Sequence, residues 1–522
     1  MTGLDPAALS VLIARLSGIA DEMGAVLRRG AFSPNIKERA DCSAAVFDAT
    51  GVMLAQAEHI PVHLGSMPAS VHAVIRVLGE LGPGEQAIVN DPFAGGTHLN
   101  DITVVAPCWH DGRLVGWVAN RAHHADVGGA APGSLPADAT DIQQEGLRLP
   151  PMRLTPEVRR VLLAASRTPI ERAGDLDAQH GANVVGVERL ARLAGAPFGE
   201  VVAYGERRCR AALAALPDGE WTAEDHLDST GSAPDQQRPA RLRCTVRIDG
   251  ERIEFDFTGT EAQRPGNTNA VRAVTVSAVA FALRSVVDPG LPATDGTMVP
   301  VTVRTEPGTI VDARFPAAVG AGNVEVSQRV ADVVCRALAL AAPDRVGAAS
   351  QGTMNNVLIG GAGPAGHWVY YETVGGGQGG RPPHPGRVGA APAPGMSGVH
   401  TGMTNTLNTP VEALERAFPL RVLRYRLRTD SGGTGAAPGG EGIERDLEVL
   451  VDATVSLITE RRTSAPWGLA GGGPGAVGEN WLLPGGDESR AERLPDKCTV
   501  ALHAGDVVRM LTPGGGGWGQ SV

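Results

Sequence analysis

Lysine is nearly absent from this chain of 522 residues, which contains only Lys37 and Lys497. A phosphate-gripping P-loop places a lysine directly after a glycine-rich loop, and neither lysine follows one. We therefore expect the glycine clusters to sit at turns rather than to bind a nucleotide, and any ATP to bind elsewhere. These clusters occupy residues 375–380, 431–440, 471–473 and 514–517.

Other features are missing as well. No basic stripe interleaved with aromatic residues occurs, and the net charge is −11, which argues against nucleic acid as a partner. The six cysteines have no Cys-x-x-Cys spacing and indicate reduced thiols in a cytosolic protein. Residues 5–29 predict an amphipathic helix whose charges interrupt any signal peptide or membrane span. We expect a cytoplasmic protein that contacts no membrane.

The length predicts two or three packed lobes, because one simple core rarely serves so long a chain. Strand-like and helix-like segments are mixed, so we expect a mixed α/β (α+β) fold. Helices are predicted over 158–166 and 181–216, followed by a break at 217–219. The expected regions are a hairpin-rich, metal-binding N-terminal region (1–215), a central α/β region (216–437) and a β-rich C-terminal region (438–522).

The most informative segment is a predicted β-hairpin over residues 102–120. Its β-branched and aromatic residues flank Asp111-Gly112, a strong two-residue turn signal. Folding the chain about that turn sets Asp101, before the first strand, opposite His123, after the second. His98 lies three residues before Asp101 and can reach the same point. Two imidazoles and a carboxylate that converge in this way suit a divalent metal that activates water.

A second predicted hairpin, over residues 43–55, repeats this arrangement. Asp41 precedes its first strand, and His59 follows its second, with His63 four residues later. The alternatives are less specific: Asp41 could simply cap a turn, and both histidines are more typical of packed or hydrogen-bonded loop residues than of ligands.

Eight strings spread along the chain carry a resemblance. They are SPNIKER (33–39), HIPVHLGSM (59–67), NDPFAGGTHLND (90–101), NRAHHAD (120–126), SQGTMNN (350–356), TNTLNTP (404–410), DSGG (430–433) and TPGGGG (512–517). Together with Asp41 and Ser43, they resemble the hydantoinase B/oxoprolinase family over essentially the whole chain.

The resemblance implies a division of labour. Members of this family are metal-carrying subunits that work with a hydantoinase A-type, ATP-binding partner, possibly as an A2B2 assembly. The partner phosphorylates a lactam or imide such as a hydantoin or 5-oxoproline, and the B-type subunit opens the ring with metal-bound water. The implied ligands are Asp41, His98, Asp101 and His123, for zinc or manganese. ATP would bind to the partner and not here.

The reaction also needs a base and a positive group for the phosphate. His124, Asp126 and His59 are candidates for the base or hydrogen-bond partner of the attacking water. Arg121 and Arg39 are candidates for the positive group, although Arg121 could as easily pair with a structural carboxylate. If the strand continues, His124 points away from the neighbouring His123, so only one of the pair is expected to bind metal.

Two other functions fit the same residues. A B-like subunit of an acetone- or acetophenone-type ATP-dependent ketone carboxylase has a related metal site, but its chain is considerably longer, so length favours the hydrolase. A non-enzymatic scaffold would be favoured by loss of the ligand residues, and all are present. One departure concerns Gly322, where the resemblance leads us to expect an arginine. If that arginine helps to shape the substrate pocket, we expect an unusual substrate here.

Overall fold

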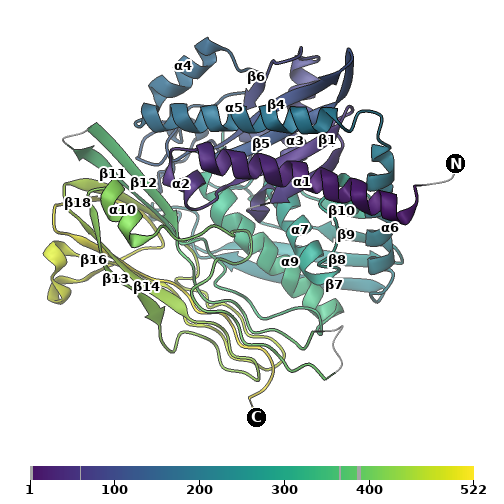
Figure 1. Ribbon diagram of the computed structural model, residues 1–522. Coiled ribbons are helices and arrows are strands. Elements are labelled where there is room, and N and C mark those ends of the chain that lie inside the picture. Colours follow the sequence, from purple (N-terminus) through teal and green to yellow (C-terminus); the bar gives the residue numbers. More distant parts are fainter. Residues whose placement is uncertain (1–3, 59, 364–365, 385–388, 522) are drawn as a thin grey trace.

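The computed structural model describes residues 4–58, 60–363, 366–384 and 389–521 (Figure 1). It confirms a mixed α/β fold with several sheets, in which β9 and β10 form the one parallel pair seen within these residues. No helix in the described part of the chain combines the length and apolar character needed to cross a membrane.

The first sheet has six strands in the order β2-β1-β5-β4-β3-β6. Two long helices, α1 (Pro6–Gly30) and α5 (Pro169–Ala191), lie side by side on one face, and α3 (Ser66–Leu78) covers the other (Figure 1). Successive residues of a strand point to opposite faces. β1, for example, contributes side chains both to the core under α1 and α5 and to the core under α3. The strands are β1 (Cys42–Asp48), β2 (Met53–Glu58), β3 (Ala87–Val89), β4 (Asp101–His110), β5 (Arg113–His123) and β6 (Met152–Arg153).

The predicted hairpin over 102–120 is confirmed as β4 and β5. Asp111 and Gly112 both have positive φ, of 48° and 72°, as a tight two-residue hairpin turn requires. A one-residue bulge at Val115 shifts the antiparallel register, so that Asp101 pairs directly with His123 rather than with Ala122. The second predicted hairpin is also confirmed, as β1 and β2.

The second sheet has the order β10-β9-β8-β7 and packs against α9, which in turn packs against α7. The apolar side chains of these two helices and of β8 belong to one continuous core. These elements are β7 (Gly219–Leu227), β8 (Ala240–Asp249), β9 (Arg252–Asp256), β10 (Val301–Arg304), α7 (Arg272–Val286), α9 (Ser327–Ala341) and, before α9, the π-helical turn η4 (Gly322–Val326).

Two further sheets contain the C-terminal strands, in the orders β12-β11-β15-β18 and β13-β14-β19-β16-β17. Both sheets combine strands from before and after residue 438, so β pairing here extends beyond the expected C-terminal region; the division into three regions stays a prediction. The strands are β11 (Asn356–Gly363), β12 (Gly366–Thr373), β13 (Leu420–Arg428), β14 (Gly442–Val449), β15 (Ala453–Ile458), β16 (Glu479–Leu483), β17 (Glu492–Leu494), β18 (Lys497–Leu502) and β19 (Val507–Leu511).

The single helix predicted over 181–216 was wrong. The helix that includes residue 181 begins earlier, at Pro169, and ends at Ala191, and α6 starts only at Phe198. Gly195, with a φ of 82°, and Pro197 separate the two helices, since neither residue favours a helix interior. The remaining helices are α2 (Pro34–Lys37), α4 (Pro156–Ala165), α6 (Phe198–Leu213), α8 (Asp295–Met298) and α10 (Val411–Ala417).

The glycine clusters were also expected at turns, and most of their residues lie instead in extended segments that run side by side near the C-terminus (Figure 1). Backbone hydrogen bonds join these segments directly, as from Gly515 N to Gly440 O and from Gly433 N to Gly515 O. A Cβ atom at Gly377 would collide with the backbones of Gly440 and Gly515. Glycine is therefore needed here because the backbones pack against one another without side chains between them.

Candidate metal centre

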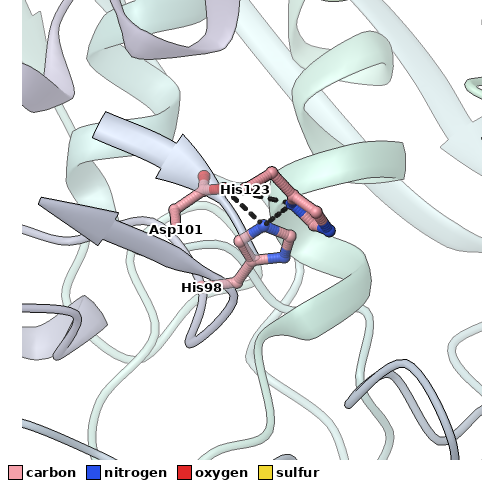
Figure 2. Close-up of side chains that lie close together, drawn as sticks. All are labelled: His98, Asp101 and His123. Carbon is pink, nitrogen blue, oxygen red and sulfur yellow. Dashed lines mark hydrogen bonds and ion pairs between the residues drawn. The ribbon is translucent and has the colours of Figure 1, made fainter. Parts of the chain in front are cut away.

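The centre is built at the open end of the β4–β5 hairpin. Asp101 begins β4, His123 ends β5, and His98 comes from the turn before β4, so that the three side chains converge (Figure 2). Their exposed fractions are 1%, 2% and 0%. One potential ligand atom from each residue lies within 4.8 Å of the other two. The sequence prediction that these three residues meet is confirmed.

The three side chains already contact one another. Asp101 Oδ1 lies 3.1 Å from His98 Nε2 and 3.1 Å from His123 Nδ1, and the two imidazole nitrogens are 3.2 Å apart. Burial opposes ionisation of Asp101, but the charge of His98 and hydrogen bonds from the histidines outweigh it and hold the pKa of this carboxyl well below its usual range. Asp101 is therefore ionised at neutral pH.

The pKa values of the two histidines shift in opposite directions. Burial lowers the pKa of His123 to about 3, so its imidazole is neutral. Burial also disfavours the charged form of His98, but the negative charge of Asp101 outweighs it and raises the pKa of His98. His123 Nε2 is buried and has no hydrogen-bond partner among the described residues. A neutral imidazole whose Nδ1 faces the group, a second imidazole and a carboxylate fit a divalent metal.

Asp41 lies beside this group but outside it. Its backbone carbonyl accepts a hydrogen bond from His123 N, while its carboxylate is not among the ligand atoms that converge in the described residues. Burial raises the pKa of Asp41 to about 7, with the Arg39 charge opposing the shift and Asp101 adding to it. Its role as a ligand stays a prediction.

Arg39 and Arg121 are both fully buried near the centre. Arg39 stacks its guanidinium over the Tyr371 ring at 4.9 Å, and that ring stacks in turn on His123 at 4.6 Å. Arg121 donates to the hydroxyls of Thr103, Ser66 and Ser70. Burial lowers the pKa of Arg121 to about 10, so it keeps its charge at neutral pH.

Two of the three predicted bases, His124 and Asp126, have their side chains held away from the centre. His124 faces α5, where its Nε2 lies 2.9 Å from Gln179 Oε1. Asp126 is held by Arg167 and by the backbone N–H groups of Gly128 and Gly133. His59 lies outside the described residues. The role of each as a base stays a prediction.

Other residues contact the centre without having been singled out for it. Thr97 Oγ1 donates to Asp101 Oδ2 at 2.6 Å, and Asn323 Nδ2 donates to the same oxygen at 3.1 Å. His63, expected as a hydrogen-bonded loop residue, lies with Nε2 3.3 Å from this oxygen and with Nδ1 2.9 Å from Ser43 Oγ. Thr97 and His63 belong to strings of the family resemblance, whereas Asn323 and Tyr371 lie outside every such string and are distant in sequence.

Gly322 leaves no room for the arginine that was expected there. A Cβ atom at this position would collide with the carbonyl of Asn269 and approach Ala270. The chain can follow this path only with glycine at 322.

A cleft of about 1230 Å³ is lined in part by residues that are close in the chain to contacts of the centre. Pro61, Gln328 and His400 are among its lining residues. Pro61 is two residues from His63, and Gln328 follows η4 on α9. The three converging ligand residues are buried and do not line the cleft.

Fold and centre together describe a mixed α/β protein with a buried group suited to a divalent metal. The chain belongs to the hydantoinase B/oxoprolinase family, whose model matches residues 5–521.

Relatives cover nearly the whole chain. It is 41% identical to the uncharacterized protein MJ0963 of Methanocaldococcus jannaschii over 99% of this chain and 91% of that protein. It is 36% identical to 5-oxoprolinase 1 of Arabidopsis thaliana, of which it spans 42%, so it corresponds to less than half of that protein. It is 30% identical to the putative B-type subunit of a D-/L-hydantoinase from a Pseudomonas species, over 99% of this chain and 90% of that relative.

Two solved structures share the fold. The ATP-dependent caprolactamase of Pseudomonas jessenii superposes with a TM-score of 0.88 at 27% identity, over 99% of this chain and 92% of that one. An acetone carboxylase superposes with a TM-score of 0.87 at 18% identity, over 99% of this chain and 76% of that one. The second likeness concerns the fold alone.

Proposed function

We propose that this chain is the metal-dependent catalytic subunit of an ATP-dependent cyclic amidase, and that it opens a lactam or imide ring such as a hydantoin or 5-oxoproline. The observation that carries the proposal is the buried group of His98, Asp101 and His123, in a chain of this family. Asp41, adjacent to the group, is the proposed fourth ligand. Zinc and manganese both accept such mixed nitrogen and oxygen ligands.

The chemistry explains why such a reaction needs both ATP and a metal. A ring amide is a poor electrophile, and phosphorylation of its oxygen creates a good leaving group. A divalent metal supplies Lewis acidity and lowers the pKa of bound water toward about 7. The chain's own residues hold the site in a buried, low-dielectric surrounding, where each charge acts more strongly than in water.

Charge at the centre favours an anionic substrate. Arg39 and Arg121 supply two buried positive charges whose hydrogen bonds go to neutral oxygen atoms. The carboxylates of Asp41 and Asp101 can balance these two charges, so a divalent ion leaves the centre net positive. A phosphorylated ring amide suits that charge. We propose Arg39 and Arg121 for this role.

ATP would be used by a hydantoinase A-type partner, possibly in an A2B2 assembly. Two observations support this. One relative, covered to 90%, bears the name of a hydantoinase subunit of the B type, and the match to a 5-oxoprolinase spans 42% of that longer protein. The alternative is a B-like subunit of a ketone carboxylase. The chain spans 92% of the caprolactamase chain but 76% of the acetone carboxylase chain, which favours the amidase.

Metal analysis by inductively coupled plasma mass spectrometry tests the centre. Wild type and the exposed-histidine control His503→Ala should retain near-stoichiometric zinc or manganese through dialysis. His98→Ala and His123→Ala should lose the metal while far-ultraviolet circular dichroism shows that they remain folded. Full metal content in both variants would rule out the assignment.

Reconstitution with an A-type partner separates the two enzyme classes. Consumption of hydantoin, 5-oxoproline or caprolactam that requires ATP supports the amidase, and it should be absent in His98→Ala and His123→Ala. Bicarbonate-dependent consumption of a ketone would instead favour the carboxylase.

A further inference from the structure

One short segment from the middle of the chain reaches all three converging ligand residues. It comprises residues 319–325 and includes most of the π-helical turn η4. π-helical turns are rare and frequently mark functional sites. The segment directly precedes α9 and lies more than 190 residues after the β4–β5 hairpin. Strand pairing within the two hairpins therefore gives no indication of its contacts with the ligand residues.

The first contact fixes His98. Its Nδ1 lies 3.3 Å from the carbonyl oxygen of Gly320, and an N–H donated to that oxygen leaves Nε2 facing Asp101 and His123. Glu145 holds this part of the segment, because its carboxylate accepts hydrogen bonds from the N–H groups of Val319 and Gly320 at 3.1 and 2.8 Å.

The second contact is direct and involves Asn323. Its Nδ2 donates to Asp101 Oδ2, the carboxylate oxygen that does not face the two histidines of the group. Asn323 is buried, and its Oδ1 has no hydrogen-bond partner among the described residues. A buried amide oxygen without a donor is costly, so this carboxamide is held in place for its contact with Asp101.

The third contact reaches His123 through two intermediate residues. Asn356 Nδ2 donates to Glu325 Oε1 at 2.8 Å, and the Tyr371 hydroxyl donates to Asn356 Oδ1 at 3.0 Å. The Tyr371 ring then stacks on His123, with an angle of 25° between the ring planes. Glu325 therefore fixes the ring that covers one side of His123.

We propose that this π-helical segment is the positioning element of the metal centre, with Asn323 as its principal positioning residue and Glu325 as a second, indirect one. The inference rests on the proposed metal-binding function. Residues two positions apart on a helix point to nearly opposite sides, so Asn323 and Glu325 can serve different ligands from one turn. Gly322 lets that turn pack closely against Asn269.

Cobalt affinity and cobalt absorption test this proposal without measuring activity. Metal-free wild type, Asn323→Ala and Asn183→Ala are titrated with Co²⁺, and the dissociation constant is determined by competition with a chelator. Asn183 is a matched control, because it is also a buried asparagine and it bonds to Val104 O and Gln86 on the opposite face of the same sheet.

Removal of a residue that hydrogen-bonds to a metal ligand typically weakens metal binding ten- to a hundredfold. We expect that loss, with a shifted visible absorption band, in Asn323→Ala but not in Asn183→Ala. Glu325→Gln keeps an acceptor for Asn356 and should bind Co²⁺ like wild type, whereas Glu325→Ala should bind it several-fold more weakly. The comparison of Glu325→Gln with Glu325→Ala still tests the proposal if Asn323→Ala does not fold.

Two negative outcomes are distinguishable. Unchanged affinity and spectrum in Asn323→Ala and Glu325→Ala would overturn the positioning role and leave the metal centre standing. Failure of wild type to bind Co²⁺ or Zn²⁺ would overturn the proposed function, and this inference with it.

Discussion

The chain contains two buried polar clusters of opposite design. At the metal centre, Asp101 is surrounded by imidazoles, a hydroxyl and an amide. In the second cluster, which we call the ion-pair network, carboxylates pair with ammonium and guanidinium groups. The network consists of Asp225, Arg329, Asp332, Glu460, Arg461, Asp496 and Lys497.

The comparison shows how burial can serve either architecture or chemistry. The network sets three cationic side chains against four carboxylates: Lys497 Nζ lies 2.6 Å from Glu460 and 2.9 Å from Asp496, and Arg329 bridges Glu460 to Asp225. At the metal centre, His98 Nε2, Asp101 Oδ1 and His123 Nδ1 lie 3.1–3.2 Å from one another and suit an added cation. The network instead contains its own cations.

The largest expected effect comes from breaking the network with Lys497→Met. Burial disfavours the charge of Lys497, but Asp496 and Glu460 outweigh it and raise its pKa. The substitution leaves Asp496 without its cation and Glu460 with Arg329 alone. Removal of one partner of a buried ion pair typically costs about 3–5 kcal/mol. Urea unfolding should show that loss, while the folded fraction keeps the wild-type metal content.

The other lysine provides the control. Lys37 is exposed, so Lys37→Met should change the free energy of unfolding by less than about 0.5 kcal/mol. Loss of metal in Lys497→Met at temperatures where it is folded would show that the two clusters are not separate in function.

The sequence predicted the metal centre better than the network because the centre depends on local pairing. The turn at Asp111-Gly112 and a one-residue bulge at Val115 together set the register that brings Asp101 to His123. Asn323 and Tyr371 arrive through packing between distant segments, for which periodicity and turn signals give no information. The glycine clusters misled for a related reason: glycine marks close backbone approach as well as turns.

An intermediate effect is expected at Glu325, which lies between the clusters and bonds to Asn356. Burial raises the pKa of Glu325 to about 8, and the charge of Glu460 adds to the shift. The folded protein thus retains a proton that the unfolded chain releases near pH 4.5, the ordinary value. Stability therefore falls as pH rises from that value to about 8, by up to about 1.4 kcal/mol per pH unit for this group.

Urea unfolding of metal-free protein between pH 5 and 8 measures this slope. Glu325→Gln cannot ionise, so its unfolding midpoint should fall less steeply with rising pH than that of wild type. Burial raises the pKa of Glu145 to about 7, so a residual slope is expected. Equal slopes in wild type and Glu325→Gln would mean that Glu325 ionises at its ordinary pH in the folded protein.

The smallest expected effect is that of removing the Tyr371 hydroxyl while its aromatic ring is kept. Tyr371→Phe keeps the aromatic stack on His123 but removes the hydrogen bond to Asn356, which should cost about 1 kcal/mol of stability. Tyr371→Leu also removes the stack, so it should weaken Co²⁺ binding further than Tyr371→Phe does. If both variants bind Co²⁺ as tightly as wild type, the cover over His123 contributes only to folding, and the metal centre is positioned through His98 and Asp101 alone.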